Sequence, residues 1–224
     1  LLLIFFNDLS FIFFSIFFWA FFEQSGGSLS LFALNNLHPS LLGITVDTNS
    51  VNNSANSLFV IAFSALAGLF WLWLSKRKAE PNSVVKFGFG FLFLAAGFYI
   101  FKSTLGFADA NGITSTEVFT FAWFVITFGE LCLSPIGLSL MTKLSPVRIQ
   151  GLMMGMWFLA SAYGQYAAGL LGAGMSAENP DATNYDKLVL YTEGYGHLGL
   201  YALIAGAALI ILSPLVRKLM REVH

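Results

Sequence analysis

The chain has 224 residues, of which 57% are hydrophobic and only 10% are charged. A soluble domain of this size has too little interior to hide so much apolar surface, and about 25% of its residues are normally charged. The composition therefore excludes an ordinary soluble protein and indicates a chain whose main solvent is the lipid bilayer. The formal net charge of −1 gives no reason to expect a nucleic acid partner.

Few residues of the chain could ligate a metal. Cys132 is the only cysteine, so neither an internal disulfide nor a cysteine-based metal site can form. His38 and His197 lie in or beside polar segments and His224 is the last residue, so we expect no metal site. The chain opens at Leu1 without an initiator methionine or a signal peptide, and we expect it to be part of a longer protein.

Six apolar stretches follow one another along the chain, each about as long as a helix that crosses the hydrocarbon core of a bilayer. They predict an all-α integral membrane fold in which residues 1–224 form one bundle of six transmembrane helices. The expected spans cover approximately residues 11–33, 56–74, 84–101, 118–141, 152–174 and 194–212.

The first span carries Glu23 near its centre. An ionised carboxylate at mid-bilayer costs several kcal/mol, so it must be protonated, paired with a cation or facing a wet cavity. Trp19 lies four residues earlier and so on the same helix face, while Gly26 and Gly27 allow close helix approach or local unwinding. A structural ion pair is the alternative to a functional acid.

The fourth span carries a second acid, Glu130, near its centre. Pro135 cannot donate the hydrogen bond that the carbonyl of Leu131 would normally accept, so the helix is weakened directly beside the acid. Because Gly137 follows two residues later, we expect a bend that could act as a hinge. Helix packing is the alternative reason for a proline at this position.

The fifth span presents Trp157, Ser161 and Gln165 at intervals of four residues, which predicts a polar and aromatic stripe on one helix face. We interpret this stripe as functional, because a glutamine that points at lipid would be costly. Gly151 and Gly155 form a small-xxx-small pair, which we interpret as a packing motif.

Basic residues predict the orientation of the spans. Nine of the eleven lie on one side, which the positive-inside rule makes cytoplasmic, so we expect both ends of the chain inside. None lies near the middle of a span, so a second set of helices with basic residues is needed to close a polar cavity around Glu23 and Glu130. The nine are Lys76, Arg77, Lys78, Lys86, Lys143, Arg148, Arg217, Lys218 and Arg221.

Three segments carry a family pattern: FWAFFEQSG at residues 18–26, GELCLSPIG at 129–137 and GLMMGMWFL at 151–159. They resemble the seventh, tenth and eleventh helices of the proton-coupled oligopeptide transporter family, a branch of the major facilitator superfamily. The segments occur in the family's order, and together they extend over nearly the whole chain. One departure is Ser57 after Asn56, where the family usually has proline.

The resemblance implies that the chain is the carboxyl-terminal six-helix bundle of a two-lobed transporter that alternates access to a central peptide site. It implies a proton-coupled symporter that imports di- and tripeptides, with protons as the coupling ion and no cofactor. The implied location is the bacterial inner membrane, with both ends of this chain cytoplasmic. The implied partners are the lipid bilayer, a small peptide and an amino-terminal six-helix half that supplies basic residues.

The resemblance also assigns roles to single residues. Glu23 would pair with an arginine of the other half and help control the external gate, and Glu130 would lie by a lysine near the peptide amino terminus. The residues expected to bind substrate are Trp19, Asn56, Glu130, Trp157 and Ser161. Those expected to serve proton coupling and gating are Glu23, Glu130, Pro135 and Gly137.

Other functions stay open at this point. The closest alternative is a transporter of the same fold for another small solute, because fold does not fix function. A membrane-embedded enzyme that uses the two glutamates as acid and base is disfavoured, since the sequence has no His or Cys cluster, no Gly-x-Ser-x-Gly and no phosphate loop. A non-transporting receptor would leave the buried acids without an evident purpose.

Overall fold

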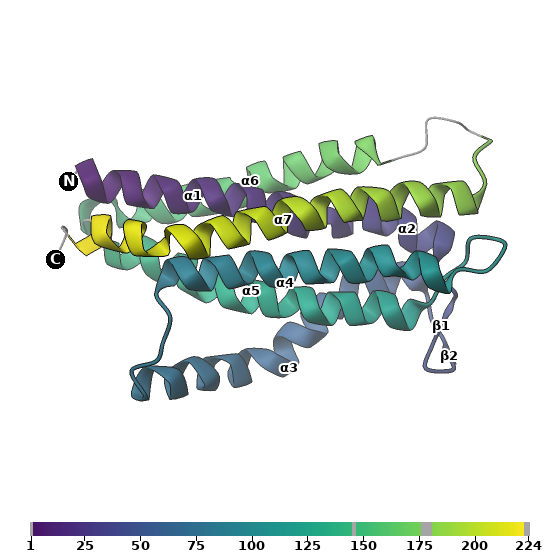
Figure 1. The fold of residues 1–224 in the computed structure, drawn as a ribbon, viewed down its shortest axis with the longest axis horizontal. Helices are drawn as coiled ribbons and strands as arrows, with labels where there is room; N and C mark the ends of the chain where they lie inside the picture. Colours follow the sequence, from purple (N-terminus) through teal and green to yellow (C-terminus); the bar gives the residue numbers. More distant parts are fainter. Residues whose placement is uncertain (1, 145–146, 176–180, 222–224) are drawn as a thin grey trace.

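The computed structural model describes residues 2–144, 147–175 and 181–221. Its long helices run side by side, and α1 begins at the same end of the bundle at which α7 ends (Figure 1). The all-helical fold is confirmed, and the described residues add one short hairpin of two strands. The elements are α1 (Leu2–Phe22), η1 (Glu23–Gly26), α2 (Ser28–Asn36), β1 (Ser40–Leu41), β2 (Ile44–Thr45), α3 (Thr48–Lys76), α4 (Ser83–Ser103), η2 (Thr104–Phe107), α5 (Thr116–Leu144), η3 (Val147–Ile149), α6 (Gln150–Gly174) and α7 (Asn184–Arg221).

Every expected span falls within these helices, the first being divided among α1, η1 and α2. Among the described residues, four stretches are long and apolar enough to cross a membrane. They are Thr48–Lys76, Ser83–Phe107, Thr116–Leu133 and Asn184–Leu215. The spans expected in α1–α2 and in α6 stay predictions.

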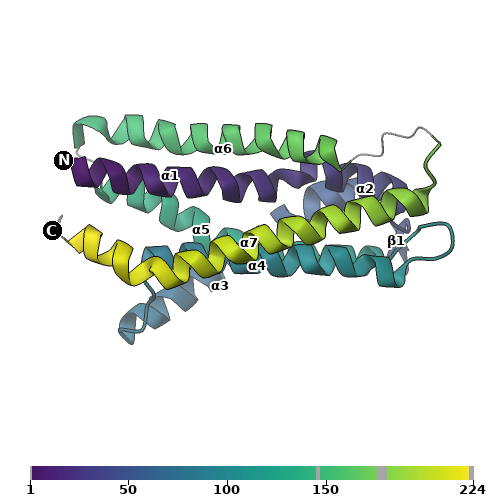
Figure 2. The same cartoon turned by 45° about the horizontal axis from the view of Figure 1, so that its top comes forward.

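Two helix pairs form the frame of the bundle. The first pair is α4 with α7 and the second is α1 with α6, and α5 packs against α4 (Figure 2). Aromatic rings fill the core between them: Phe101, Phe119 and Tyr195 are buried, and the centroids of the first two rings lie 5.0 Å apart. Gly97 lets α4 approach α5, because a Cβ there would lie 2.2 Å from Ile126 Cγ1. Close packing of this kind drives helix association in lipid, where the tails are as apolar as the side chains.

The first expected span is interrupted, because the chain unwinds at η1 and Gly27, which has φ −124° and ψ −113°. The unwinding expected at the glycine pair is therefore observed. The Gln24 side chain holds this break in place. Its amide nitrogen donates to the carbonyls of Ala20 (3.1 Å) and Ala168 (3.2 Å), and its oxygen accepts from the Ser28 hydroxyl (2.7 Å). Since Ala168 belongs to α6, the break is a fixed feature tied to a second helix.

The helix of the second span begins at Thr48, eight residues before the start expected at Asn56. Asp47 caps this start: its carboxylate accepts a hydrogen bond from the backbone N–H of Ser50 at 2.7 Å, which satisfies a donor that has no partner within the helix. The first two turns of α3 are rich in asparagine and serine. An apolar stretch in the sequence therefore marks only the later part of this helix and not its polar first turns.

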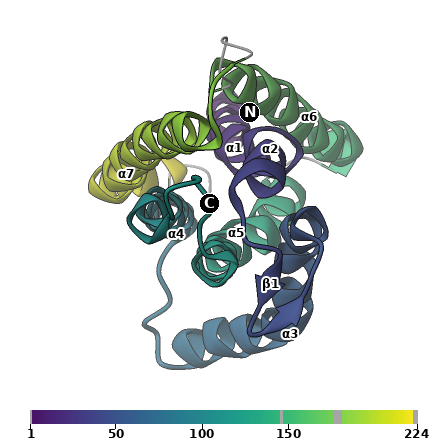
Figure 3. The same cartoon turned by 90° about the vertical axis from the view of Figure 1, so that its right-hand side faces the viewer.

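α3 is the helix least embedded in the described chain. It follows the edge of the bundle and then runs away from the other helices (Figure 3). Its buried residues, Thr48, Asn52 and Ala55, lie in its first turns, and its most apolar stretch contains none, whereas 61% of the corresponding stretch of α4 is buried. Leu66 and Leu69 are 57% and 62% exposed. α3 therefore offers a long apolar surface to lipid or to a further protein segment.

The Asp47 cap predicts a pH dependence at the start of α3. Hydrogen bonds from the side chain and backbone of Ser50 hold the pKa of the Asp47 carboxyl below its ordinary value. A lowered pKa means that the cap stabilises the folded state above the unfolded value of about 3.9, and that this contribution is lost as the pH falls through the lowered value. We expect hydrogen exchange of residues 48–51, corrected for the intrinsic rate, to accelerate over that acid range.

Asp47→Asn provides the matched control for this prediction. Asparagine is an equally good capping residue but does not titrate, so protection at the start of α3 should then be independent of pH. Identical pH profiles of exchange in the wild type and in this variant would contradict the assignment.

Candidate functional site

A small polar hollow of about 340 Å³ lies where the break after α1 faces α3, α5 and α6. Five residues expected at the site line it, each from a different element. Trp19 comes from α1, Glu23 from η1, Asn56 from α3, Glu130 from α5 and Ser161 from α6. The fold thus brings together residues that lie far apart in the sequence.

Glu130 is held by a short hydrogen-bond chain. The Asn56 amide donates to Glu130 Oε2 at 2.9 Å and to the Thr127 hydroxyl at 3.2 Å, and that hydroxyl donates to the carbonyl of Trp123 at 2.8 Å. Asn56 therefore ties α3 to α5 across the hollow. α3 is helical from Thr48 to Lys76, so Ser57, at the position of the family's usual proline, leaves the helix unbroken.

Glu23 projects from the unwound segment into the same hollow and is partly buried. Its side chain has a long polar contact with α6: Gln165 Nε2 donates to Glu23 Oε1 at 3.4 Å. No basic residue of the described chain lines the hollow. Two carboxylates that share one hollow repel each other when both are ionised, so the site needs protons or an outside cation. In the part of the chain that the structure describes, no group of His, Cys, Asp and Glu could hold a metal ion.

The hollow also has residues that the sequence analysis missed, most clearly Asn52 and Trp123. Asn52 is 1% exposed and donates from Nδ2 to the carbonyl of Ser25 at 2.9 Å. Among the described residues, Asn52 Oδ1 and the indole N–H groups of Trp19 and Trp123 are buried without a hydrogen-bond partner. An unpaired buried polar atom costs about 1–3 kcal/mol, and three of them belong to residues that line this one hollow.

Trp157 is placed differently from the other expected residues. It is 4% exposed and is not among the residues that line the hollow. Its ring fills a notch at Gly137 of α5, where a Cβ would lie 2.0 Å from Trp157 Cη2, and it meets the Phe87 ring edge to face at 6.3 Å. Pro135 lies within α5, but its side chain is outside the described residues, so the expected bend stays a prediction.

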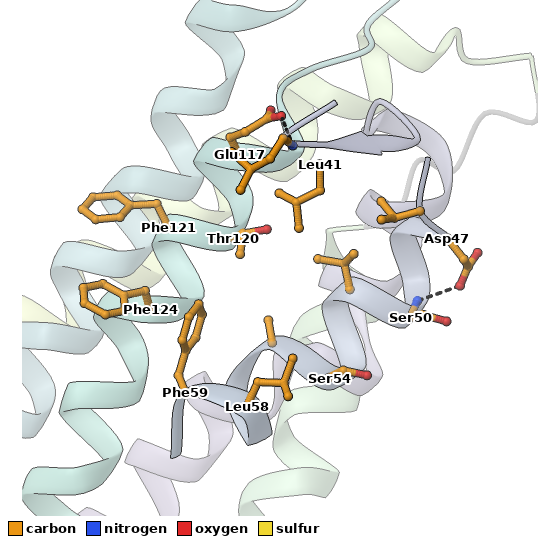
Figure 4. A pocket seen from close by; sticks show the side chains of 14 residues that line it. Leu41, Asp47, Ser50, Ser54, Leu58, Phe59, Glu117, Thr120, Phe121 and Phe124 are labelled. Atoms are coloured by element: carbon orange, nitrogen blue, oxygen red, sulfur yellow. Dashed lines mark hydrogen bonds between the residues drawn. The ribbon is translucent and has the colours of Figure 1, made fainter. Parts of the chain in front are cut away.

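A larger hollow, of about 1000 Å³, lies under the hairpin between the first halves of α3 and α5 (Figure 4). Its walls are mainly apolar and include Leu58, Phe59 and Phe124. The two acids that line it make structural hydrogen bonds: Asp47 caps α3, and Glu117 accepts a hydrogen bond of 3.1 Å from the backbone N–H of Leu42. The smaller polar hollow is therefore the candidate site.

Comparisons with known proteins show the family of this chain. A sequence profile described as the POT family matches residues 6–187. The chain belongs to the POT family. It is 35% identical over 211 residues to the peptide transporter YePEPT of Yersinia enterocolitica, and 29% identical over 207 residues to the dipeptide and tripeptide permease B of Aeromonas hydrophila. It also matches a crystal structure of a peptide transporter POT in complex with sulfate, with a TM-score of 0.79 and 27% identity over 95% of this chain.

POT family membership excludes the alternative of a membrane-embedded enzyme, because POT proteins are membrane peptide transporters and not enzymes. The chain spans only part of its relatives: each alignment covers 92% of this chain, but 39% of YePEPT and 41% of the Aeromonas permease. It covers 40% of the transporter in the sulfate complex. The activity of a whole transporter is therefore a proposal for this chain.

Proposed function

We propose that this chain forms the carboxyl-terminal half of a proton-coupled symporter that imports di- and tripeptides by alternating access. The observation that carries the proposal is the pair of carboxylates, Glu23 and Glu130, in one polar hollow to which the described chain contributes no cation. An amino-terminal six-helix half would supply the basic partners. The proposed location is the bacterial inner membrane, with both ends of this chain cytoplasmic.

In this proposal Glu130 carries the coupled proton and Glu23 controls the external gate. Asn56 orients Glu130 from α3, and Trp19 and Ser161 bound the peptide on either side. Substrate would displace the Gln165 amide from Glu23 at little cost, because a contact of 3.4 Å is weak.

The proposal assigns a role at the internal gate to three residues: Trp157 of α6, and Gly137 and Pro135 of α5. Trp157 in the Gly137 notch couples α6 to α5 below the hollow, where the two helices must move if the internal gate opens. Substrate contact by Trp157 requires a second conformation in which its ring leaves this notch.

Uptake by the complete transporter in liposomes tests the proposal. An inward proton gradient should drive accumulation of a labelled dipeptide above its outside concentration, and a protonophore should abolish the accumulation. Free amino acids and sugars serve as competing solutes. Accumulation of one of these in place of peptides would favour the alternative of a transporter of the same fold for another solute.

Asn52 gives a second test of the hollow. Asn52→Ala removes an amide whose oxygen is buried and unpaired among the described residues, so a hydrogen bond to a substrate N–H would be lost. One hydrogen bond of about 1.4 kcal/mol corresponds to about a tenfold rise in KM for dipeptide uptake. Asn111→Ala, at an exposed asparagine of the loop before α5, is the control and should leave KM unchanged. An unchanged KM in the Asn52 variant would remove this residue from the substrate site.

A further inference from the structure

An apolar groove of about 580 Å³ lies between α3, α4 and α5, at the end of the bundle where the chain passes from α3 to α4. Its walls include Ala67 and Phe70 of α3, Phe93 of α4 and Cys132 of α5, and Pro81 of the connecting loop closes it. No charged residue lines it. The groove is separate from the polar hollow.

The groove faces away from the polar hollow. Phe128 and Cys132 of α5 line the groove, and they lie two residues before and two residues after Glu130. At 3.6 residues per turn, a step of two residues turns a side chain to about 160° around the helix, so both residues point away from the acid. A second half that docks over Glu130 and Glu23 therefore leaves this groove open to lipid.

The chain is strongly basic between Leu74 and Pro81, two residues that line the groove. Lys76, Arg77 and Lys78 follow one another at the end of α3 and are exposed. Arg77 lies 4.0 Å above the ring of Trp73.

A fourth basic residue, Lys86, lies 4.5 Å above the ring of Trp71 and forms an ion pair with Glu80. This pair is neutral overall, so the three consecutive cations set the charge of this part of the chain. Tryptophan and basic residues together are typical of the level of the lipid headgroups.

We propose that this groove binds an anionic phospholipid. One acyl chain lies against Ala67, Phe70 and Phe93, and the headgroup phosphate lies among Lys76, Arg77 and Lys78. The argument is one of charge complementarity: each basic residue near an anionic lipid surface contributes about 1 kcal/mol, and the groove holds the chain of the same molecule. Since α3 is otherwise weakly embedded, the lipid would fix it against α4 and α5.

Lipid retention measured by native mass spectrometry tests the proposal. The complete transporter, purified in detergent, is incubated with phosphatidylglycerol or with phosphatidylcholine, and the bound lipid is counted. We expect the wild type to retain phosphatidylglycerol at least about tenfold better than phosphatidylcholine, given about 1 kcal/mol for each cation. Ala67→Trp, which fills the groove, and the triple variant Lys76→Gln, Arg77→Gln, Lys78→Gln should each abolish the preference.

Two control variants separate this site from the general lipid shell. Ala205→Trp fills a comparable apolar groove of about 690 Å³ between α1, α6 and α7, and Lys187→Gln removes a cation in the first turn of α7, away from the loop between α3 and α4. Both should keep the preference. Equal retention of the two lipids, or a preference that survives Ala67→Trp, would overturn the proposal. Size-exclusion profiles check folding, and Ala67→Phe replaces the tryptophan variant if that variant aggregates.

Discussion

Glu130→Gln is expected to abolish proton-driven accumulation of peptide while exchange of peptide across the membrane persists. Glutamine keeps the shape of the side chain and an oxygen that can still accept the hydrogen bond from Asn56, which is 2.9 Å long in the structure. It removes only the ability to titrate. Folding and insertion should therefore be preserved, and the loss should be specific to the coupled reaction.

The physical reason is linkage between proton binding and conformation. A carboxylate that is ionised in one access state and protonated in the other couples the two equilibria, and the coupling is reciprocal. In this structure the hollow gives Glu130 one amide donor from Asn56 and no cation from the described chain. Movement of a cation of the other half toward Glu130 and away from it would release and take up the proton.

The decisive measurement compares two modes in one preparation of the complete transporter. Accumulation under an imposed pH gradient needs net proton movement, whereas exchange of labelled for unlabelled peptide without a gradient does not. Glu117→Gln is the matched control, because Glu117 lies on the same helix but in its first turn, outside the polar hollow. Unchanged accumulation in the Glu130 variant would make this acid a structural group.

The sequence predicted the helices of this bundle well, because the length of an apolar run is a direct consequence of bilayer thickness. It also predicted that Glu23, Glu130, Trp19, Trp157 and Ser161 face one cavity, because a carboxylate is too costly to leave in lipid; all of them except Trp157 line the polar hollow. It missed the start of α3, since the turns from Thr48 onward are polar and face the hollow.

Two other features depend on contacts that no local pattern reveals. The Gln24 side chain, which stabilises the break after α1, donates a hydrogen bond to the carbonyl of Ala168, which lies 144 residues further along the chain. The stripe on α6 was interpreted as one face, but each step of four residues turns about 40° beyond a full turn. Over the two steps from Gln165 to Trp157 the face turns by about 80°, and the tryptophan enters the core between α5 and α6.

The notch at Gly137 predicts the other large effect. A Cβ at this position would lie 2.0 Å from Cη2 and 2.2 Å from Cζ2 of Trp157, and the tryptophan is packed against the fully buried Phe87. Gly137→Ala gains up to about 1 kcal/mol of helix propensity. It also forces an overpacked contact that costs about 1–3 kcal/mol, so we expect a lower thermal midpoint and slower peptide exchange. Gly169→Ala on α6, where a Cβ would meet nothing within 4 Å, should be neutral.

A double-mutant cycle separates this contact from a general intolerance of substitution. Trp157→Leu alone removes a buried ring and should destabilise the protein by about 3 kcal/mol or more. In the Gly137→Ala background the smaller leucine leaves room for the added methyl group, so the same substitution should cost less there, with a coupling free energy of about 1 kcal/mol. Thermal unfolding in detergent gives the stabilities, and peptide exchange in liposomes shows whether the pair also controls the proposed internal gate. Strictly additive effects would mean that α5 and α6 adjust independently of the ring, and that Gly137 is small for a reason other than Trp157.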